Sequence, residues 1–180
     1  MILEETLNRL LRDTIDLLLA SPGYTIKAKQ KDAPRPEGPY SDVDYISDTS
    51  IGMEQRTLED NLGDSDITEN ISGLREIMFS FGFYRDGARD NARFARTRLV
   101  RESAQELFRA AGVGLTSRSE IREISEALEN GWEERAQFDI VLSAVGTDSD
   151  IIKSIQSVDM GLELQTNGLI YNSTITIEVQ

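Results

Sequence analysis

The sequence predicts an α+β fold, a mostly antiparallel sheet with an N-terminal helix and a long central helix packed on it. Two segments show helical spacing of apolar residues, and several others show strict alternation of apolar and polar residues. Asp-Gly and Asn-Gly pairs, which are typical of tight turns, separate several of these segments. The chain has 180 residues, a length that suits one core, so we expect a single domain over residues 1–180.

The first half of the chain begins with a helix over residues 2–20, where leucine and isoleucine recur at spacings of three and four. Ser21-Pro22-Gly23 ends this helix. A short strand is expected over 24–30. The proline-rich stretch 33–40 must be a connection outside the sheet interior, because proline cannot donate a backbone hydrogen bond.

Residues 41–70 form an acidic segment with nine acids and one arginine. Alternation of Val43, Tyr45 and Ser47 with charged residues indicates a strand in its first half. The second half lacks a core-forming pattern, so we predict an exposed acidic loop over residues 57–69.

The second half of the chain predicts a half-buried strand over 74–84, a break at Asp86-Gly87, and one long helix over 88–112 that Gly112 closes. Residues 120–131 fit either a helix or a hairpin around Asn130-Gly131. A strand over 132–145 is expected to place Trp132 on the core face and Glu133 on the opposite face. A hairpin around Asn167-Gly168 closes the chain.

Arginine is concentrated in residues 83–102, which hold six arginines beside three acids, although the whole chain has a net charge of −13. Three interpretations remain open for this segment: a solvated helix face with internal ion pairs, a row of salt bridges between subunits, or a phosphate-binding surface. The negative charge of the rest of the chain opposes general adhesion to nucleic acid or anionic lipid.

The composition makes catalysis a poor expectation. The chain has no cysteine and no histidine, so thiolate chemistry, the commonest general base and the commonest transition-metal ligand are missing. Asp42, Asp44 and Asp48 could offer oxygens to a divalent cation, as could three acids in 60–66, but their spacing does not fit a calcium loop. We therefore expect no enzyme, no metal and no cofactor. The longest apolar stretch is also too short to span a membrane.

Three stretches resemble the phage neck or tail terminator proteins: APRPEGPY (33–40), FGFYRDGARDNA (81–92) and NGWEERAQFDIVL (130–142). The resemblance implies a virion structural protein of the neck or tail, assembled in the host cytoplasm. It implies a ring, usually of six copies, that caps the tail tube and docks on the head connector. The implied partners are further copies of the chain, the tail tube protein and the connector or collar protein, with the tail sheath as a further candidate.

This resemblance gives the charged residues an expected use. Subunit-interface candidates are Arg85, Arg89, Arg93 and Arg96, which would face acids of a neighbouring copy. Channel or rim candidates are Asp42, Asp44, Asp48, Asp60, Asp64 and Asp66. An acidic channel would let double-stranded DNA pass without specific binding, because like charge repels a polyanion.

Other functions stay open at this point. The closest is a head-completion or connector protein, which would bind the portal rather than the tube. An acidic adaptor for a basic partner would be a monomer or dimer. A hydrolase that works through metal-bound carboxylates would need several acids converging on one pocket.

Overall fold

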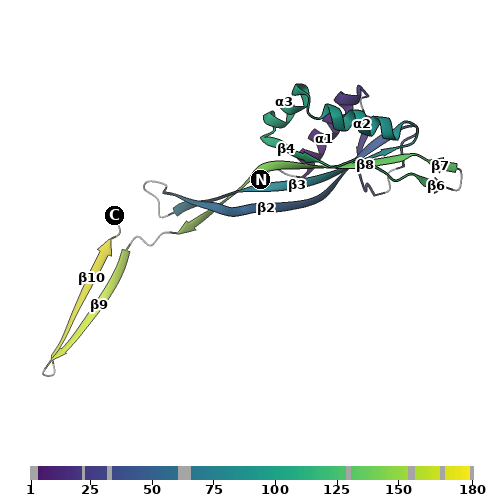
Figure 1. Ribbon diagram of the computed structural model, residues 1–180. Coiled ribbons are helices and arrows are strands. Elements are labelled where there is room, and N and C mark those ends of the chain that lie inside the picture. Colours follow the sequence, from purple (N-terminus) through teal and green to yellow (C-terminus); the bar gives the residue numbers. More distant parts are fainter. Residues whose placement is uncertain are drawn as a thin grey trace. The chain divides into compact units, whose positions relative to one another are not determined.

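The structure is a computed structural model, and it describes residues 4–21, 23–31, 34–60, 66–128, 131–153, 157–166 and 169–178 (Figure 1). Two compact units make up the chain. The first comprises residues 1–54 and 72–146, and the second comprises residues 55–71 and 147–180.

The prediction of an α+β fold with a mostly antiparallel sheet is confirmed. The main sheet has the strand order β1-β2-β3-β8-β4, with β5 also paired to β8. The strands are β1 (Thr25–Lys27), β2 (Tyr40–Asp60), β3 (Asp66–Tyr84), β4 (Val113–Arg118), β5 (Arg122–Glu123) and β8 (Arg135–Lys153). β1 runs parallel to β2, whereas β4 and β5 run antiparallel to β8.

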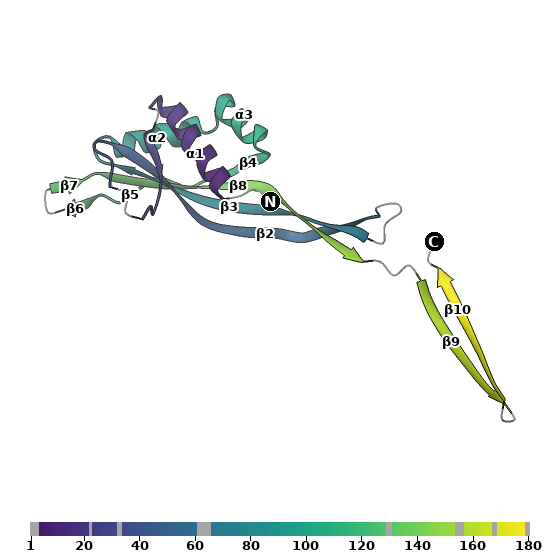
Figure 2. The ribbon, with the colours of Figure 1, turned by 180° about the vertical axis from the view of Figure 1, so that it is seen from behind.

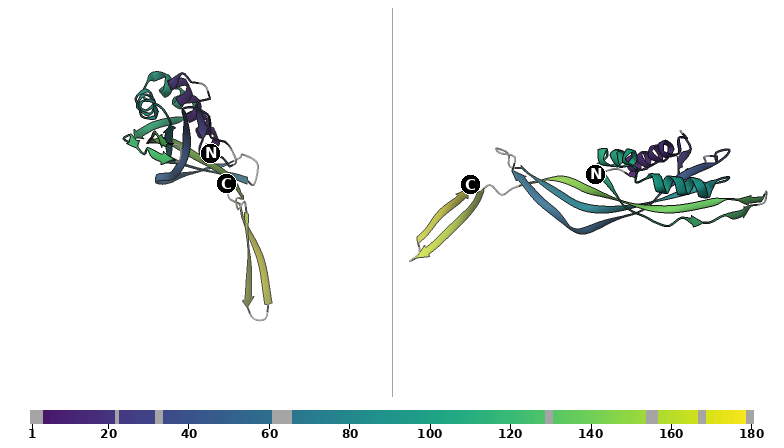
Figure 3. Two further views of the ribbon diagram at one scale, coloured as in Figure 1. Left: turned by 90° about the vertical axis from the view of Figure 1, so that its right-hand side faces the viewer. Right: turned by 45° about the horizontal axis from the view of Figure 1, so that its top comes forward.

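Three helices cover one face of this sheet in the first unit: α1 (Glu4–Leu19), α2 (Ala88–Arg98) and α3 (Glu102–Ala110). The opposite views of Figures 1 and 2 and the two views of Figure 3 agree on this one-sided layering. A sheet covered on one face should alternate buried and less buried residues, and β8 alternates half-buried and buried residues from Arg135 to Ala144.

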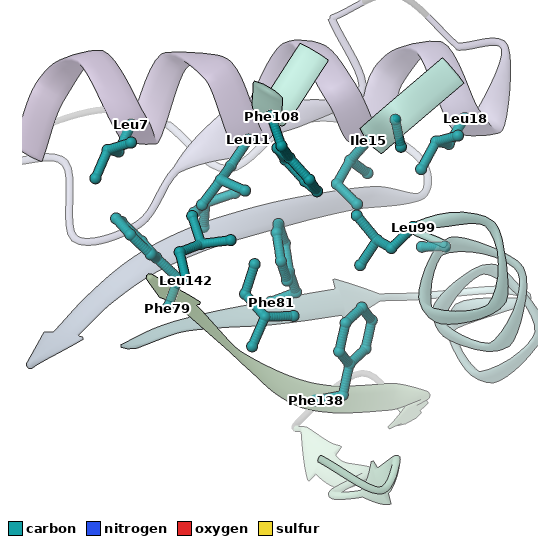
Figure 4. Close-up of a cluster of buried hydrophobic side chains, with 14 of the residues drawn as sticks. Leu7, Leu11, Ile15, Leu18, Phe79, Phe81, Leu99, Phe108, Phe138 and Leu142 are labelled. Atoms are coloured by element: carbon teal, nitrogen blue, oxygen red, sulfur yellow. The ribbon is translucent and has the colours of Figure 1, made fainter. Parts of the chain in front are cut away.

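The core lies between α1 and the sheet (Figure 4). Leu7, Leu11 and Ile15 point from α1 toward the phenylalanines of β3 and β8, and all are at most 1% exposed. The rings of Phe81 and Phe138 meet with centroids 5.3 Å apart. Full burial of each such side chain contributes about 1.5–3 kcal/mol of transfer free energy.

The prediction of one long central helix is wrong, because two shorter helices, α2 and α3, occupy this part of the chain. Arg101, the residue before α3, has extended dihedral angles (φ −67°, ψ 150°). At about 100° per residue, one continuous helix would place Ala104 and Phe108 roughly 140–180° around from Leu99. All three side chains are fully buried, so the chain must break between them to bring both sets to the core.

Two further expectations need correction. The exposed acidic loop predicted over 57–69 is strand at 57–60 and 66–69, and residues 61–65 lie outside the described part. Trp132 is not in the core: it is 72% exposed, whereas Glu133 is only 8% exposed. The reason is a break in the strand at Glu134, which separates β7 (Gly131–Glu133) from β8 and reverses the alternation.

The hairpin alternative is confirmed for the ambiguous segment, because β6 (Glu126–Leu128) pairs antiparallel with β7. In the second unit, β9 (Ser157–Thr166) and β10 (Leu169–Glu178) form the expected C-terminal hairpin, a two-stranded sheet of its own. Its turn residues, 167–168, lie outside the described part.

Candidate subunit-interface and channel residues

The α2 helix exposes Arg89 and Arg93, whereas its Arg96 and Arg98 donate to backbone carbonyls of other segments. Ala88, Ala92 and Ala95 are fully buried, so this narrow stripe of small side chains lets the helix pack closely on the core. Arg89 and Arg93 lie on the flank of this stripe and are each 60% exposed at the side chain. The helix therefore presents two guanidinium groups to solvent.

The partners of these two arginines are loose and exposed. Arg89 Nη1 lies 3.7 Å from Glu123, and Arg93 Nη1 lies 3.5 Å from Asp90 one turn earlier. Exposed pairs of this kind contribute at most about 1 kcal/mol, because solvent screens them and side-chain entropy opposes them. Both guanidinium groups can therefore change partners at little cost.

Arg96 has a different role from Arg89 and Arg93. Its Nε donates to the Ser119 carbonyl at 2.6 Å, and its own carbonyl accepts from Arg118 Nη1 at 2.5 Å. The two bonds tie α2 to the end of β4. Arg96 therefore connects α2 to β4 within the same chain.

Arg85 is also held by its own chain. It sits in the left-handed region (φ 69°) at the turn between β3 and α2. Its Nη1 donates to the Gly38 carbonyl at 2.8 Å, and its guanidinium lies over the Tyr40 ring at 5.6 Å. These contacts anchor the proline-rich connection to the turn.

Asp42 is turned into the outer face of the sheet. Its carboxylate accepts from Gly82 N and from Tyr84 Oη, each at 3.1 Å. A Cβ at Gly82 would collide with this carboxylate, so the glycine makes room for it. Burial raises the pKa of the Asp42 carboxyl above its ordinary value, although the bonds from Tyr84 and Gly82 oppose the shift.

The other candidate acids fall into two groups. Asp44 pairs with Lys29 at 2.6 Å, and Asp48 pairs with Arg75 at 2.8 Å. Asp66 begins β3 and is half-buried, while Asp60 ends β2 with its side chain outside the described part. Asp64 also lies outside the described residues. Asp42, Asp44 and Asp48 thus each have a separate partner along the strands.

Sequence reasoning missed a buried ionic cluster at the other end of β8. The Glu133 carboxylate accepts from Arg135 Nε at 2.6 Å, and Arg35 and Arg85 lie 3.7 and 3.8 Å from it. Arg135 in turn lies over the ring of Tyr84, which stacks on Tyr40 at 4.6 Å. The sequence holds no local signal for this cluster, because its members come from three separate segments.

Glu134, at the break before β8, caps the N-terminus of α2. Its carboxylate accepts from the backbone N–H groups of Gly87 and Arg89, at 3.0 and 3.2 Å. Gly87 has no side chain to cap α2, so Glu134 satisfies these free N–H groups and places a negative charge at the positive end of the helix.

Residues 1–167 match the family of phage neck terminator proteins. The chain belongs to this family. A search of curated proteins finds no match. The neck terminator is thus a structural protein of the phage neck, located in the virion, where it associates with other head or tail proteins.

The outer face of the sheet has a hollow of about 270 Å³. Ser80, Gln137 and Asp139 form hydrogen bonds with one another here, since Ser80 Oγ donates to Asp139 at 2.6 Å and accepts from Gln137 at 2.6 Å. This network satisfies polar groups of the sheet. In the part of the chain that the structure describes, no three acidic side chains converge in a way that could hold a metal ion.

Among the described residues, no helix is both long and apolar enough to cross a membrane.

Proposed function

We propose that the protein forms a closed ring of six copies that terminates the tail tube and joins it to the head connector. The match to phage neck terminators over residues 1–167 carries this proposal. The ring would bind the tail tube protein on one face and the connector or collar protein on the other, with a tail sheath as a further partner. It would assemble in the host cytoplasm and would need no catalysis.

An acidic channel for DNA is the second part of the proposal. The net charge of −13 supports it, because a basic wall would hold DNA through counterion release, whereas an acidic wall lets it slide. The Asp42 carboxylate already accepts hydrogen bonds from Tyr84 and Gly82 within the sheet. The channel or rim assignment therefore rests on Asp44, Asp48, Asp60, Asp64 and Asp66.

The proposed contact between copies uses the α2 arginines. A ring interface joins two unlike patches, so each copy must present complementary surfaces. Arg89 and Arg93 are exposed and only loosely paired, and we propose that carboxylates of the neighbouring copy replace their present partners. Arg85 and Arg96 would support this surface through the bonds that they make within the chain.

Charge reversal of Arg93 tests the proposal. Multi-angle light scattering of the purified chain should give the mass of six copies, and Arg93→Glu should lower that mass at the same concentration and salt. The matched control is Arg109→Glu on α3, which is also exposed (61%) but is not an interface candidate, and it should leave the mass unchanged. A wild-type chain that stays monomeric at every concentration would exclude the ring.

The capping role needs its own measurement. Addition of the assembled protein to growing tail tubes should stop elongation, and addition of the Arg93→Glu variant should not. A protein that binds the portal and leaves tube growth unaffected would instead be a head-completion protein.

A further inference from the structure

The C-terminal hairpin has one apolar and one acidic face. β9 and β10 pair without interruption from Leu169↔Thr166 to Glu178↔Ser157, and directly opposed residues of an antiparallel pair lie on the same face. One face takes Val158, Met160, Leu162 and Leu164 of β9 with Leu169, Tyr171, Ile175 and Ile177 of β10. The other face takes Asp159, Glu163 and Glu178 together with Ile170 and neutral polar residues such as Asn172, and the sequence after Lys153 has no basic residue.

The two edges of this hairpin lack the features that keep sheet edges apart. Exposed edges are usually blocked by lysine, by proline or by a β-bulge. Residues 157–178 contain no lysine and no proline, and the register of the hairpin has no shift. Within the described residues, β9 and β10 pair only with each other. Each strand therefore offers one outer edge to a further strand.

A hairpin of two strands needs additional structure to be stable. Two strands alone are marginal in water, and a third strand or a packed face is required. β9 and β10 are each ten residues long, so the outer edge of one hairpin matches that of a second hairpin over its full length. A second copy of the same segment is thus a complementary partner.

We propose that β9–β10 pairs edge to edge with the same hairpin of neighbouring copies of this chain. The inference rests on the proposed ring, because rotation about a ring axis brings β10 of one copy beside β9 of the next in antiparallel orientation. Closure of the ring leaves no free edge.

Single-cysteine copies test the pairing directly, because the chain has no cysteine of its own. Copies with Glu163→Cys are mixed with copies that carry Asn172→Cys, Thr174→Cys or Thr176→Cys, all on the acidic face. A disulfide needs Cα atoms within about 7 Å, so only adjacent strands can be linked. We expect a disulfide-linked dimer in at least one of the three mixtures. Each variant alone should stay unlinked, since equivalent residues in successive hairpins are about 10 Å apart.

Hydrogen exchange of the unmodified full chain gives an independent measurement. In the free hairpin, roughly half of the amide N–H groups of 157–178 point outward without a partner strand. We expect these amides to exchange more slowly in the ring than in the diluted monomer.

The outcomes separate this inference from the ring itself. A ring that forms by light scattering, with neither a mixed disulfide nor new protection in 157–178, overturns the hairpin pairing and leaves the ring proposal standing. Equal protection in monomer and ring shows that the chain covers its own hairpin and also overturns the inference. Protection of the 157–178 amides that appears only when another phage protein is added likewise overturns the inference. A chain that never self-associates overturns both proposals.

Discussion

The carboxylate of Glu133 lies buried against the guanidinium of Arg135, with a hydrogen bond of 2.6 Å from Arg135 Nε to Glu133 Oε2. Arg35 and Arg85 approach the same carboxylate at 3.7 and 3.8 Å. One acid therefore joins the proline-rich connection, the turn before α2 and the start of β8. Since Arg135 is only 15% exposed at the side chain, Glu133 is the buried counter-charge of its guanidinium.

Glu133→Gln should destabilise the first unit. The substitution leaves Arg135 without its buried counter-charge, and loss of one member of a buried ion pair typically costs about 3 kcal/mol. The free energy of unfolding in urea measures this cost. The control is Glu126→Gln, because Glu126 contacts the same arginine but is 54% exposed, and its loss should cost less than about 1 kcal/mol. Equal losses of stability in the two variants would show that the buried Glu133–Arg135 pair contributes no more than the exposed Glu126–Arg135 pair.

Phe138→Ala should be among the costliest single substitutions in the chain. Phe138 is fully buried and meets both Phe81 and Phe83 at ring-centroid distances of 5.3 and 5.8 Å. Removal of a buried phenylalanine ring costs about 3–5 kcal/mol, because transfer free energy is lost and a cavity remains. Phe94→Ala is the same change at a position that is 49% exposed, and it should cost under about 1 kcal/mol. Thermal unfolding of both variants gives the comparison.

The core was predictable from the sequence, and the breaks in its elements were not. Alternation in 74–84 and 136–144 identifies the buried faces of β3 and β8, because period-two patterns report directly on a half-buried sheet. The break at Glu134 is different, since its carbonyl and carboxylate bind Arg85, Gly87 and Arg89. Contacts between segments so far apart in the sequence are not visible in a local pattern.

The break in the central helix did leave a signal in the sequence. Helix propensity favours continuation through 99–101, and no glycine or proline interrupts the run. The phase of the apolar residues nevertheless shifts between Leu99 and Ala104, so a single helix could not bury both.

Arg101→Ser should stabilise α3. Arg101 occupies the residue before the helix and makes no side-chain hydrogen bond to its free N–H groups. A serine there can accept from the second or third backbone N–H, which typically contributes about 1 kcal/mol. The control is Arg93→Ser inside α2, where serine is a poorer helix former and should lower stability by about 0.5 kcal/mol. If both substitutions lower the free energy of unfolding, a separate start of α3 at this residue is contradicted.

Asp42→Asn should change how stability depends on pH. Burial raises the pKa of the Asp42 carboxyl in the folded chain above the unfolded value of 3.8, so the folded state binds the proton more tightly. The resulting stabilisation is fully present below that unfolded value and is lost as pH rises through the higher folded value. Asparagine does not titrate, so the variant should gain stability relative to wild type between pH 4 and pH 7, by about 1.4 kcal/mol for each unit of the shift.

Urea unfolding of both proteins across this pH range measures the difference. Tyr84→Phe is the complementary variant, because it removes the hydroxyl that donates to the Asp42 carboxylate at 3.1 Å and lowers its pKa. Without that donor the pKa of Asp42 should rise further, and the stability of the variant should fall more steeply with increasing pH than that of wild type. A difference between Asp42→Asn and wild type that stays constant or shrinks as pH rises would contradict the burial of an ionisable group at this position.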